Sequence, residues 1–566
     1  MVHEIHDCLG NVAGLPAASI HPQLLLKPLG HEIISAIKKS RNANLPDNLT
    51  RTLQKIEQAG AAASLGQSRR GLEKESLRID PAGSISQAAH QVALGSPLTH
   101  RFITTDYSEA LLEFVTPVCE TTAQALAFMT GLHQFAYHNI GDEKLWVNSM
   151  PCVLHGEDSI PIARYGTSNA GRMKYVYRVG LAHRYSKLMQ AISGVHFNWS
   201  LAEAFWFPWR EICGSTMPLR DFRSDQYLGL VRNFYRYDWA IPYLFGASPA
   251  VCGTFLEGRS HHLEQLGHSS YYLPHATSLR LSDVGYHSKA QAQVQIGLDS
   301  LAEYLESLLQ ATSMPYPPYQ EVGIRSNGEY QQLSTTLLQI ENEYYAGIRP
   351  KRVAHSGERP IHALRERGVE YVELRYLDLN PFLPVGIDAG GSRFLELLLL
   401  LCLLKPSPPL SQDELEALSH TRTLVVEQGR RPGLLLPAGP FAQATELKAR
   451  GLQLLKDMEV IADFLDQYGE GGYRAALTRQ RACFEDSETT PSAQVLAAVH
   501  AHDDSFFSFA LEQAEQHRQY FKSLADDPAC TAQLVQEATD SLARQQVLEE
   551  TDTLSFEDFL AEYFTR

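Results

Sequence analysis

Pairs of charged residues two positions apart recur along the sequence, and their spacing suits a site for a divalent cation. Glu73 and Glu75 stand in the segment GLEKESLRI, and Glu373 and Arg375 stand in YVELRYL. Residues two apart in a β-strand lie on the same face of a sheet. If these segments are strands, each presents a carboxylate to one face, and carboxylate oxygens are ligands that Mg²⁺ prefers.

Two more segments and one flanking residue extend this pattern. Glu113 stands among apolar residues in LLEFV, and Asp106 lies shortly before it. His196 and Asn198 share a face in the segment VHFNW. Hard oxygen ligands with one imidazole are typical of Mg²⁺ or Mn²⁺ and not of a structural zinc.

Each of these segments, taken alone, is also typical of a surface strand whose polar face is solvated. Four of them in one domain favour a functional explanation, because an antiparallel sheet can gather their polar faces into one concavity. Carboxylates brought together there repel one another and raise each other's pKa values. Bound cations remove that repulsion, so the pattern predicts an acidic metal site.

An acidic metal site implies a substrate with phosphates, because Mg²⁺ commonly binds through a few carboxylates and phosphate oxygens. Positive side chains must then neutralise the transferred phosphate, and Arg375 and Arg280 are candidates. Arg349 and Lys351, in the run RPKR, could approach nucleotide phosphates, although a solvated loop explains them equally well. The segment GTSNAGRM lacks the Gly-Lys-Ser/Thr ending of a P-loop, and no G-x-G-x-x-G opens a helix.

The elements that must position these residues alternate between strands and helices. Apolar residues recur every three or four positions in 122–138, which predicts a helix. The apolar run at 397–404 predicts a buried helix, because a membrane span needs ~20 residues. This alternation indicates an α+β or α/β domain. Strands are expected at residues 71–79, 110–116, 193–200, 277–281 and 370–377.

Three regions are expected along the chain. Residues 1–55 form an N-terminal extension with a helix around residues 24–37, residues 56–405 form the sheet domain, and residues 406–566 form a mainly helical region packed on it. Proline-rich breaks lie at 314–318 and 405–409. After the second break, SQDE predicts a capping box at a helix start, and a helix from residue 441 is expected to end at Gly469.

Composition limits the classes of partner. The chain has 566 residues and a formal net charge of −16, which disfavours a nucleic-acid partner. The eight cysteines form no C-x-x-C and no disulfide framework, so they are expected to be reduced and mostly buried. The sequence shows neither a signal peptide nor a spanning segment, so we expect a cytoplasmic protein without a membrane partner.

An ordered series of motifs carries a family resemblance. The motifs are RGLEKESLR (70–78), ITTDYSEALLEF (103–114), YGTSN (165–169), ISGVHFN (192–198), IPYLFGASP (241–249), ATSLRLSD (276–283), LQIENE (338–343) and IRPKR (348–352). Together they resemble the proteobacterial type of glutamate–cysteine ligase. The resemblance runs in order from residue 65 or so to at least Gly433, and more loosely to the C-terminus.

The resemblance implies an α+β fold: a curved antiparallel β-sheet funnel of glutamine synthetase-like type, surrounded by helices, with a mainly helical C-terminal part. It also implies a reaction in which ATP activates the γ-carboxylate of L-glutamate as γ-glutamyl phosphate, which the amine of L-cysteine attacks. The product, γ-glutamylcysteine, is the first intermediate of glutathione biosynthesis. These substrates are small molecules, with ATP as co-substrate and Mg²⁺ or Mn²⁺ as cofactor.

Residue roles follow from the same resemblance. Arg375 would contact the transferred phosphate, Arg280 and Tyr286 would seat the amino-acid substrate, and Tyr177 and Tyr345 would lie near the cysteine pocket. The tyrosines could equally serve as core packing. Arg349 and Lys351 are the candidates for ATP binding. The residues that would hold the metal ions are Glu73, Glu75, Asp106, Glu113, His196 and Glu373.

Other functions remain open from the sequence. One is a carboxylate–amine ligase of the same superfamily with a different amine acceptor. Another is a non-catalytic regulator that binds glutamate or nucleotide, although the complete set of acidic ligands argues against it. After residue 433 no second Gly-rich nucleotide-binding region is visible, which argues against a bifunctional glutathione-making enzyme. Oligomeric state stays open, with a monomer as the simplest expectation.

Three further motifs favour structural explanations. HAHDD at 500–504 could pass for a metal motif, but its expected position at the start of a helix favours capping and helix-dipole effects. His262 is expected in a loop without a cluster of partners. Cys152 is expected to be a buried thiol and not a nucleophile.

Overall fold

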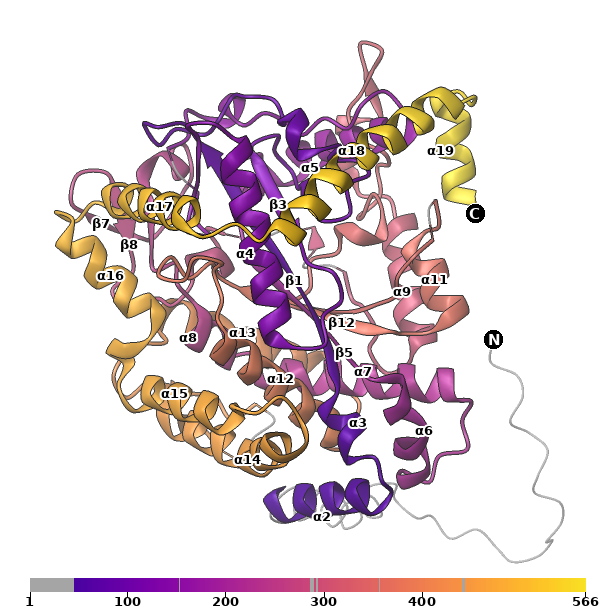
Figure 1. Ribbon diagram of the computed structural model, residues 1–566, viewed down its shortest axis with the longest axis vertical. Coiled ribbons are helices and arrows are strands. Elements are labelled where there is room, and N and C mark those ends of the chain that lie inside the picture. The colour runs from indigo at the N-terminus through magenta and orange to yellow at the C-terminus, as the bar shows by residue number, and fades with distance from the viewer. Residues whose placement is uncertain are drawn as a thin grey trace, which may run out of the picture. The chain divides into compact units, whose positions relative to one another are not determined.

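A seven-stranded antiparallel β-sheet runs through the middle of the computed structural model (Figure 1). Six strands follow the order β11-β12-β5-β1-β3-β2, and β4 pairs with the end of β1. The structure describes residues 45–565 except 152, 286–289, 292–293, 356 and 440–442. The strand bounds are β1 Ser68–Ile79, β2 Ile103–Thr105, β3 Leu111–Val115, β4 Lys144–Leu145, β5 Val195–Leu201, β11 Ile348–Lys351 and β12 Tyr371–Leu377.

Four of the five expected strands are present, as β1, β3, β5 and β12. The expected strand at residues 277–281 was wrong: Ser278 makes a single bridge to Ser248, and the short helix η5 (Leu279–Leu281) follows. The side chain of Ser278 donates a hydrogen bond to buried Asp378, and the backbone of Thr277 donates to Val426. These contacts take the place of hydrogen bonds to a neighbouring strand. The alternation of hydroxyl and leucine side chains in the sequence is therefore not a strand pattern here.

Small paired strands lie outside the central sheet. β6, β8 and β7 form a three-stranded sheet, and two hairpins join β9 with β10 and β13 with β14. Their bounds are β6 Ala250–Cys252, β7 Glu264–Leu266, β8 Ser270–Tyr272, β9 Arg325–Ser326, β10 Glu329–Tyr330, β13 Leu435–Leu436 and β14 Thr445–Glu446.

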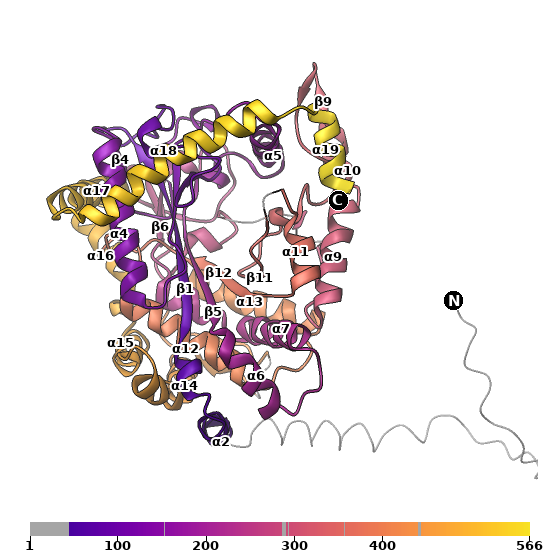
Figure 2. The same cartoon turned by 45° about the vertical axis from the view of Figure 1, so that its right-hand side comes forward.

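Helices surround the central sheet. Figure 2 shows α4 on one side of β1 and β5, with α5, α9 and α11 on the other side. The expected helix at 122–138 is confirmed as α4, and the apolar run at 397–404 lies in buried α12. The helices before residue 405 are α2 Leu45–Gln58, α3 Ala62–Gly66, α4 Thr122–Asn139, α5 Asn169–Tyr185, α6 Glu203–Ile212, α7 Leu219–Tyr237, α8 Ala240–Phe245, α9 Leu301–Ser313, α10 Pro317–Val322, α11 Pro360–Arg367 and α12 Ala389–Leu404.

After residue 405 the described chain is mainly helical. Ser411 caps α13 by accepting from the backbone of Glu414, and α14 ends before Gly469, as expected. Residues 49–566 form one compact unit. The boundary between a sheet domain and a helical region stays a prediction, and the expected helix at 24–37 lies outside the described residues. The helices are α13 Gln412–Gln428, α14 Leu447–Tyr468, α15 Tyr473–Glu485, α16 Pro491–Ala501, α17 Phe506–Ser523, α18 Pro528–Thr551 and α19 Phe556–Thr565.

The HAHDD motif occupies the end of a helix and not its start, so that expectation was wrong. His500 lies in the last turn of α16, and its Nδ1 is 2.6 Å from Asp504 Oδ1. Helix α17 begins later, at Phe506, with Ser505 as its cap. A histidine at the C-terminal end still interacts favourably with the helix dipole, so the structural explanation of the motif holds.

The face of β1 that packs on α4 holds a buried lysine. Lys74 is 4% exposed, and its Nζ lies 2.9 Å from Ser76 Oγ and 2.8 Å from His133 Nε2. His133 Nδ1 lies 2.8 Å from the carbonyl oxygen of Met129, so Nδ1 is the donor there and Nε2 accepts from the lysine. Burial lowers the pKa of Lys74 to about 7.

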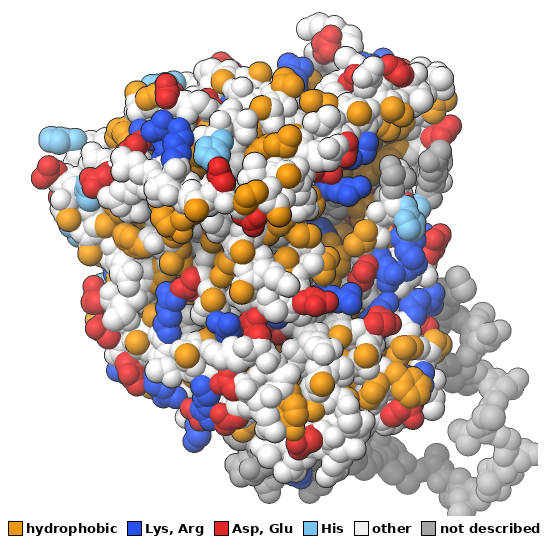
Figure 3. Space-filling view, in the orientation of Figure 1, with side chains coloured by type: hydrophobic (Ala, Val, Ile, Leu, Met, Phe, Trp, Pro, Cys, Tyr) orange, Lys and Arg blue, Asp and Glu red, His pale blue; other side chains and the backbone are white. Residues whose placement is uncertain are grey.

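The surface in Figure 3 intermingles acidic and basic side chains with scattered apolar ones. Among the described residues, no helix is long and apolar enough to cross a membrane. Six cysteines lie in the described part of the chain, and all are free thiols. Four of them are buried, namely Cys119, Cys252, Cys402 and Cys483.

The packing of α12 predicts a large effect of shortening one leucine. Leu398 is fully buried, so Leu398→Ala should lower the free energy of unfolding by about 2–5 kcal/mol through lost burial and a residual cavity. Leu542→Ala is the matched control, because Leu542 is a helical leucine with 38% exposure and should cost less than about 0.5 kcal/mol. Urea unfolding of both variants measures the difference, and equal losses would contradict the packing argument.

Candidate active site

Strand pairing places the predicted metal ligands opposite one another on one face of the central sheet. Glu73 lies opposite His196, and Glu75 lies opposite Glu113. Glu373 of β12 lies opposite Asn198 of β5. Directly opposed residues in a sheet point to the same face. We call this the polar face.

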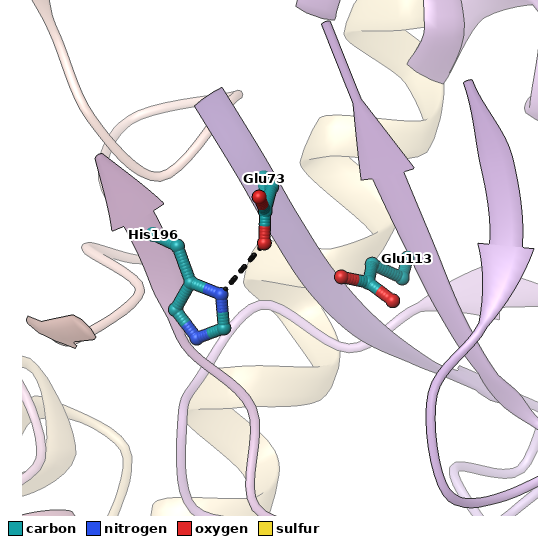
Figure 4. Close-up of side chains that lie close together, drawn as sticks. All are labelled: Glu73, Glu113 and His196. Carbon is teal, nitrogen blue, oxygen red and sulfur yellow. Dashed lines mark hydrogen bonds and ion pairs between the residues drawn. The ribbon is translucent and has the colours of Figure 1, made fainter. Parts of the chain in front are cut away.

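His196 lies at the centre of the acidic group. Its Nδ1 is 2.9 Å from Glu73 Oε2 and 3.7 Å from Glu373 Oε1, and its Nε2 is 3.7 Å from Glu75 Oε1. Figure 4 shows His196 and Glu113 on the strands that flank Glu73, with both side chains on the same side of the sheet as Glu73. One ligand atom each from Glu73, Glu113 and His196 lies within 4.8 Å of the other two, so these three could hold one ion.

Neighbouring groups fix the orientation of these carboxylates. Asn198 Nδ2 donates to Glu73 Oε1 at 2.8 Å, and the backbone N–H of Gly194 donates to Glu75 Oε2 at 2.7 Å. Glu373 instead binds cations: Arg375 Nη1 donates to its Oε1 at 2.9 Å, and Lys351 Nζ lies 3.3 Å from its Oε2. The carboxylates of the polar face therefore have fixed orientations in the protein without a ligand.

The carboxylates differ in how their charge is balanced. Loss of water, followed by repulsion from Glu73, Asp106 and Glu75, raises the pKa of Glu113 well above its ordinary value. Burial also raises the pKa of Glu75. Burial alone would raise the pKa of Glu373, but Lys351 and Arg375 hold it well below the ordinary value. Excess negative charge is thus concentrated at Glu113 and Glu75, where a divalent cation fits the donor set.

A cavity of about 500 Å³ opens next to the polar face. Its lining includes Glu75 and His196 from the sheet and Asp106 from the turn after β2. We call it the larger cavity. Its other predicted lining residues are Tyr177, Arg280, Tyr345, Arg349 and Arg375.

A second cavity of about 230 Å³, the smaller cavity, is lined by Arg349 and Lys351 of β11. It shares Arg349 and Asn342 with the larger cavity. Tyr304, Tyr344 and Tyr371 contribute aromatic rings to its wall. The two cavities are thus neighbours along one strand and the short helix η7 (Glu341–Glu343) before it.

Arg280 reaches the larger cavity from η5 and is held rigidly. Its Nη2 donates to the carbonyl of Arg375 at 3.0 Å, and its Nη1 lies 3.9 Å from Asp378 Oδ1. Gly194 permits this position, since a Cβ there would lie 2.3 Å from Arg280 Nη2. Asp378 also accepts from Ser248, Ser278 and the backbone of Ala247, which fixes the carboxylate behind the guanidinium.

The structure brings together almost all the predicted site residues. Asp106, Tyr177 and Tyr345 line the same cavity as Glu75 and His196, whereas Tyr286 lies outside the described residues. The expectation that His262 lacks partners was wrong. Asp283 and Glu427, from segments distant in sequence, each place a carboxylate oxygen within 3.8 Å of a His262 ring nitrogen.

Two cationic residues of the larger cavity were missed. Arg178 of α5 lies over the ring of Tyr165, 4.6 Å from its centroid, and donates to the carbonyl of Asp106. A helical signal existed for it, because Lys174, Arg178 and Leu181 follow the three- and four-residue spacing of one helix face. Arg422 enters the cavity from α13 and binds buried Asp238 at 2.5 Å. No local pattern marks that residue.

Comparisons with known proteins identify the family. The sequence profile described as glutamate-cysteine ligase matches residues 53–425. The chain belongs to the glutamate–cysteine ligase family. A glutamate–cysteine ligase of Pseudomonas fluorescens is 48% identical over 524 residues, covering 92% of this chain and 98% of that protein. This ligase therefore carries out the reaction expected from the resemblance, the ATP-dependent formation of γ-glutamylcysteine in glutathione biosynthesis.

Solved structures agree with the family and the fold. A crystal structure of glutamate–cysteine ligase from Francisella tularensis in complex with AMP has 35% identity and a TM-score of 0.83, covering 88% of this ligase and 98% of that chain. A bifunctional glutathione synthetase from Pasteurella multocida, at 22% identity and a TM-score of 0.66, covers 83% of this ligase and 55% of that chain, and shows the fold alone. The expected curved antiparallel sheet of glutamine synthetase-like type, surrounded by helices, is confirmed.

The charge imbalance at Glu113 predicts a pH-dependent cost in the metal-free protein. A carboxyl whose pKa is raised by folding holds its proton more tightly when folded, so stability falls as pH rises through the interval between the two pKa values. Glu113→Gln removes that charge and should raise the Tm of the EDTA-treated enzyme at pH 7. Added Mg²⁺ should raise the Tm of the wild type more than that of the variant. Calorimetry tests both statements, and a lower metal-free Tm for Glu113→Gln would contradict the first.

Proposed function

We propose that the two cavities divide the substrates of this ligase, with ATP in the smaller cavity and the amino acids in the larger one. This assignment rests on Glu373, which contacts residues of both cavities. Lys351, which lines the smaller cavity, and Arg375, which lines the larger one, both bind its carboxylate. His196 of the metal site lies 3.7 Å from the same carboxylate. A phosphoryl group transferred from ATP in the smaller cavity to glutamate in the larger cavity would pass close to the Glu373 carboxylate.

The smaller cavity suits a nucleotide. Tyr304, Tyr344 and Tyr371 offer rings against which a base can pack, while Arg349 and Lys351 offer charge to phosphates. The Francisella tularensis relative was crystallised with AMP, which supports a nucleotide site in this ligase as well.

The larger cavity suits two amino acids. Arg280 and Arg422 are guanidinium groups of the kind that bind carboxylates bidentately, and each is already aimed by a buried aspartate. Arg280 would seat glutamate, together with Tyr286. Tyr177 and Tyr345, which line the same cavity, would face the cysteine.

The acidic residues of the polar face would hold Mg²⁺, with Mn²⁺ as a substitute. The proposed ligands are Glu73, Glu75, Asp106, Glu113, His196 and Glu373. When bound, the cation screens the phosphate oxygens and lowers the repulsion between the nucleotide and the glutamate carboxylate. The raised pKa values of Glu113 and Glu75 support this assignment, because burial and repulsion from neighbouring carboxylates outweigh the effect of the cations near them.

The proposed reaction has two steps. The γ-carboxylate of glutamate attacks the γ-phosphorus of ATP, ADP leaves, and Arg375 neutralises charge on the transferred phosphoryl group. The amine of cysteine then attacks the γ-carbonyl carbon of γ-glutamyl phosphate, and inorganic phosphate leaves with its oxygen. The amine must lose a proton, which a cavity carboxylate or the departing phosphate would accept.

We propose a cytoplasmic location for this ligase, on the grounds of its free and mostly buried thiols. A reducing compartment would also keep the cysteine substrate as a thiol. We retain a monomer as the working oligomeric state, and light scattering of the purified protein tests it.

The primary experiment measures phosphate release with ATP, Mg²⁺, glutamate and cysteine, omitting each in turn. Glu73→Gln and Glu373→Gln should abolish cysteine-dependent phosphate release while the circular dichroism spectrum stays unchanged. Near-normal turnover of either variant would refute the metal assignment. Activation by other amines but not by cysteine would refute the assignment of the acceptor.

Arg375→Ala separates a transition-state role from substrate binding. If its contact strengthens as the phosphoryl group is transferred, kcat should fall roughly 100- to 1000-fold while the KM for glutamate changes little. Arg101→Ala is the control, since Arg101 is 69% exposed and its side chain bonds away from both cavities. A change confined to the KM would contradict the proposed role.

Lys351→Met tests the nucleotide cavity. The variant keeps the length of the side chain but loses its charge, so the KM for ATP should rise about tenfold, corresponding to one charged contact. The KM for cysteine should stay within about threefold of the wild type. Lys456→Met, at an exposed position of α14, controls for the loss of a lysine. An unchanged KM for ATP would remove Lys351 from the nucleotide site.

A further inference from the structure

A third cavity, of about 260 Å³, lies between α8, α12, α15 and α16, which sit together at the lower left of Figure 1. We call it the rear cavity. None of its described lining residues lines the larger or the smaller cavity. Of its lining residues, Asp378 takes part in the proposed substrate site indirectly, by holding Arg280.

The rear cavity contains a buried amide that lacks a partner. Gln480 of α15 is 5% exposed and lines the cavity, and its side chain makes no hydrogen bond within the described part of the chain. By contrast, the exposed Gln494 of α16, which also lines the cavity, donates its side-chain N–H to the carbonyl of Thr489 at 3.0 Å. Gln480 is thus placed to bind something that enters the cavity.

Charges around the rear cavity are balanced in pairs. Arg479 and Asp388 form an ion pair at its rim, where their side chains are 54% and 28% exposed. Deeper in the cavity, Asp378 accepts three hydrogen bonds and faces Arg280. Because each acid already has its cation, the cavity favours a ligand without net charge.

The remaining walls are apolar. Leu244 and Phe245 come from α8, and Leu383 and Ile387 come from the segment between β12 and α12. A ligand must therefore combine opposite charges at the rim, a short apolar stem, and a group that can pair with a primary amide.

We propose that the rear cavity is a binding site for a zwitterionic α-amino acid whose side chain ends in a neutral amide. Its carboxylate would bind Arg479, and its ammonium group would bind Asp388. These two ion pairs would replace the present ion pair between Arg479 and Asp388. The side-chain amide would pair with Gln480, and its methylene groups would contact Phe245 and Leu244. An acidic side chain is disfavoured because it would approach the carboxylate of Asp378.

The test uses calorimetric titration of the full-length enzyme with L-glutamine, in the presence of saturating L-glutamate and Mg²⁺ so that the larger cavity is occupied. L-Glutamine should bind, and L-leucine, which has a similar stem without the amide, should bind at least about tenfold more weakly. Absence of L-glutamine binding up to about 10 mM, or equal binding of the two amino acids, would overturn the proposal.

Two variants and one control variant locate the binding. Gln480→Met keeps the length of the side chain and should weaken L-glutamine binding at least about tenfold. The control Gln494→Met, in α16, should leave it within about threefold, because that amide is already hydrogen-bonded to the protein. Arg479→Met is a second variant, at a half-exposed position where a substitution should not disturb folding. It should also abolish L-glutamine binding. Unchanged binding in both Gln480→Met and Arg479→Met would place the ligand elsewhere and refute the site.

Discussion

Glu73, Glu75 and Glu113 converge on one face of the central sheet, and their mutual repulsion must be offset for the protein to remain folded. His196 and Asn198 take hydrogen-bonding positions around Glu73, and Gly194 donates to Glu75. Among the described residues, no side chain or backbone N–H donates a hydrogen bond to the carboxylate of Glu113, and burial together with repulsion from Glu73 raises the pKa of that group. Under the proposed metal assignment, a bound cation would offset this repulsion, so the arrangement of the strands would favour metal binding.

The cavities depend on this arrangement because their walls are extensions of the same strands. Glu373 and Arg375 belong to β12, and Arg349 belongs to β11, its neighbour. Residues from α5 and α13 then close the larger cavity from outside the sheet. The C-terminal helices therefore contribute to the larger cavity through Arg422, although most of them pack on other helices.

The sequence predicted the polar face well and the rest of the site less well. The alternation of side chains between the two faces of a strand is a local property of the sequence. The strands β1, β3, β5 and β12 could therefore be predicted from the segments around Glu73, Glu113, His196 and Glu373. Arg422 and the contact between His262 and Glu427 could not, because their partners come from segments more than a hundred residues away in sequence. The error at 277–281 has the same origin: a side-chain bond to distant Asp378 decided the conformation of Ser278. Assigning roles to the metal ligands depended on the family resemblance, since spacing alone indicates only a cation and a phosphate.

Lys74 gives β1 a further property. The strand carries two anions on one face and a buried cation between them on the other, where His133 and Ser76 receive it. A slip of one residue would reverse both faces at once. It would push Glu73 and Glu75 into the layer beneath α4, where the nearby polar groups include the neutral imidazole of His133. It would also bring Lys74 onto the polar face. Misaligned pairings of β1 are therefore penalised by the burial of two carboxylates without a cation, and this cost favours the correct register of the central strand during folding.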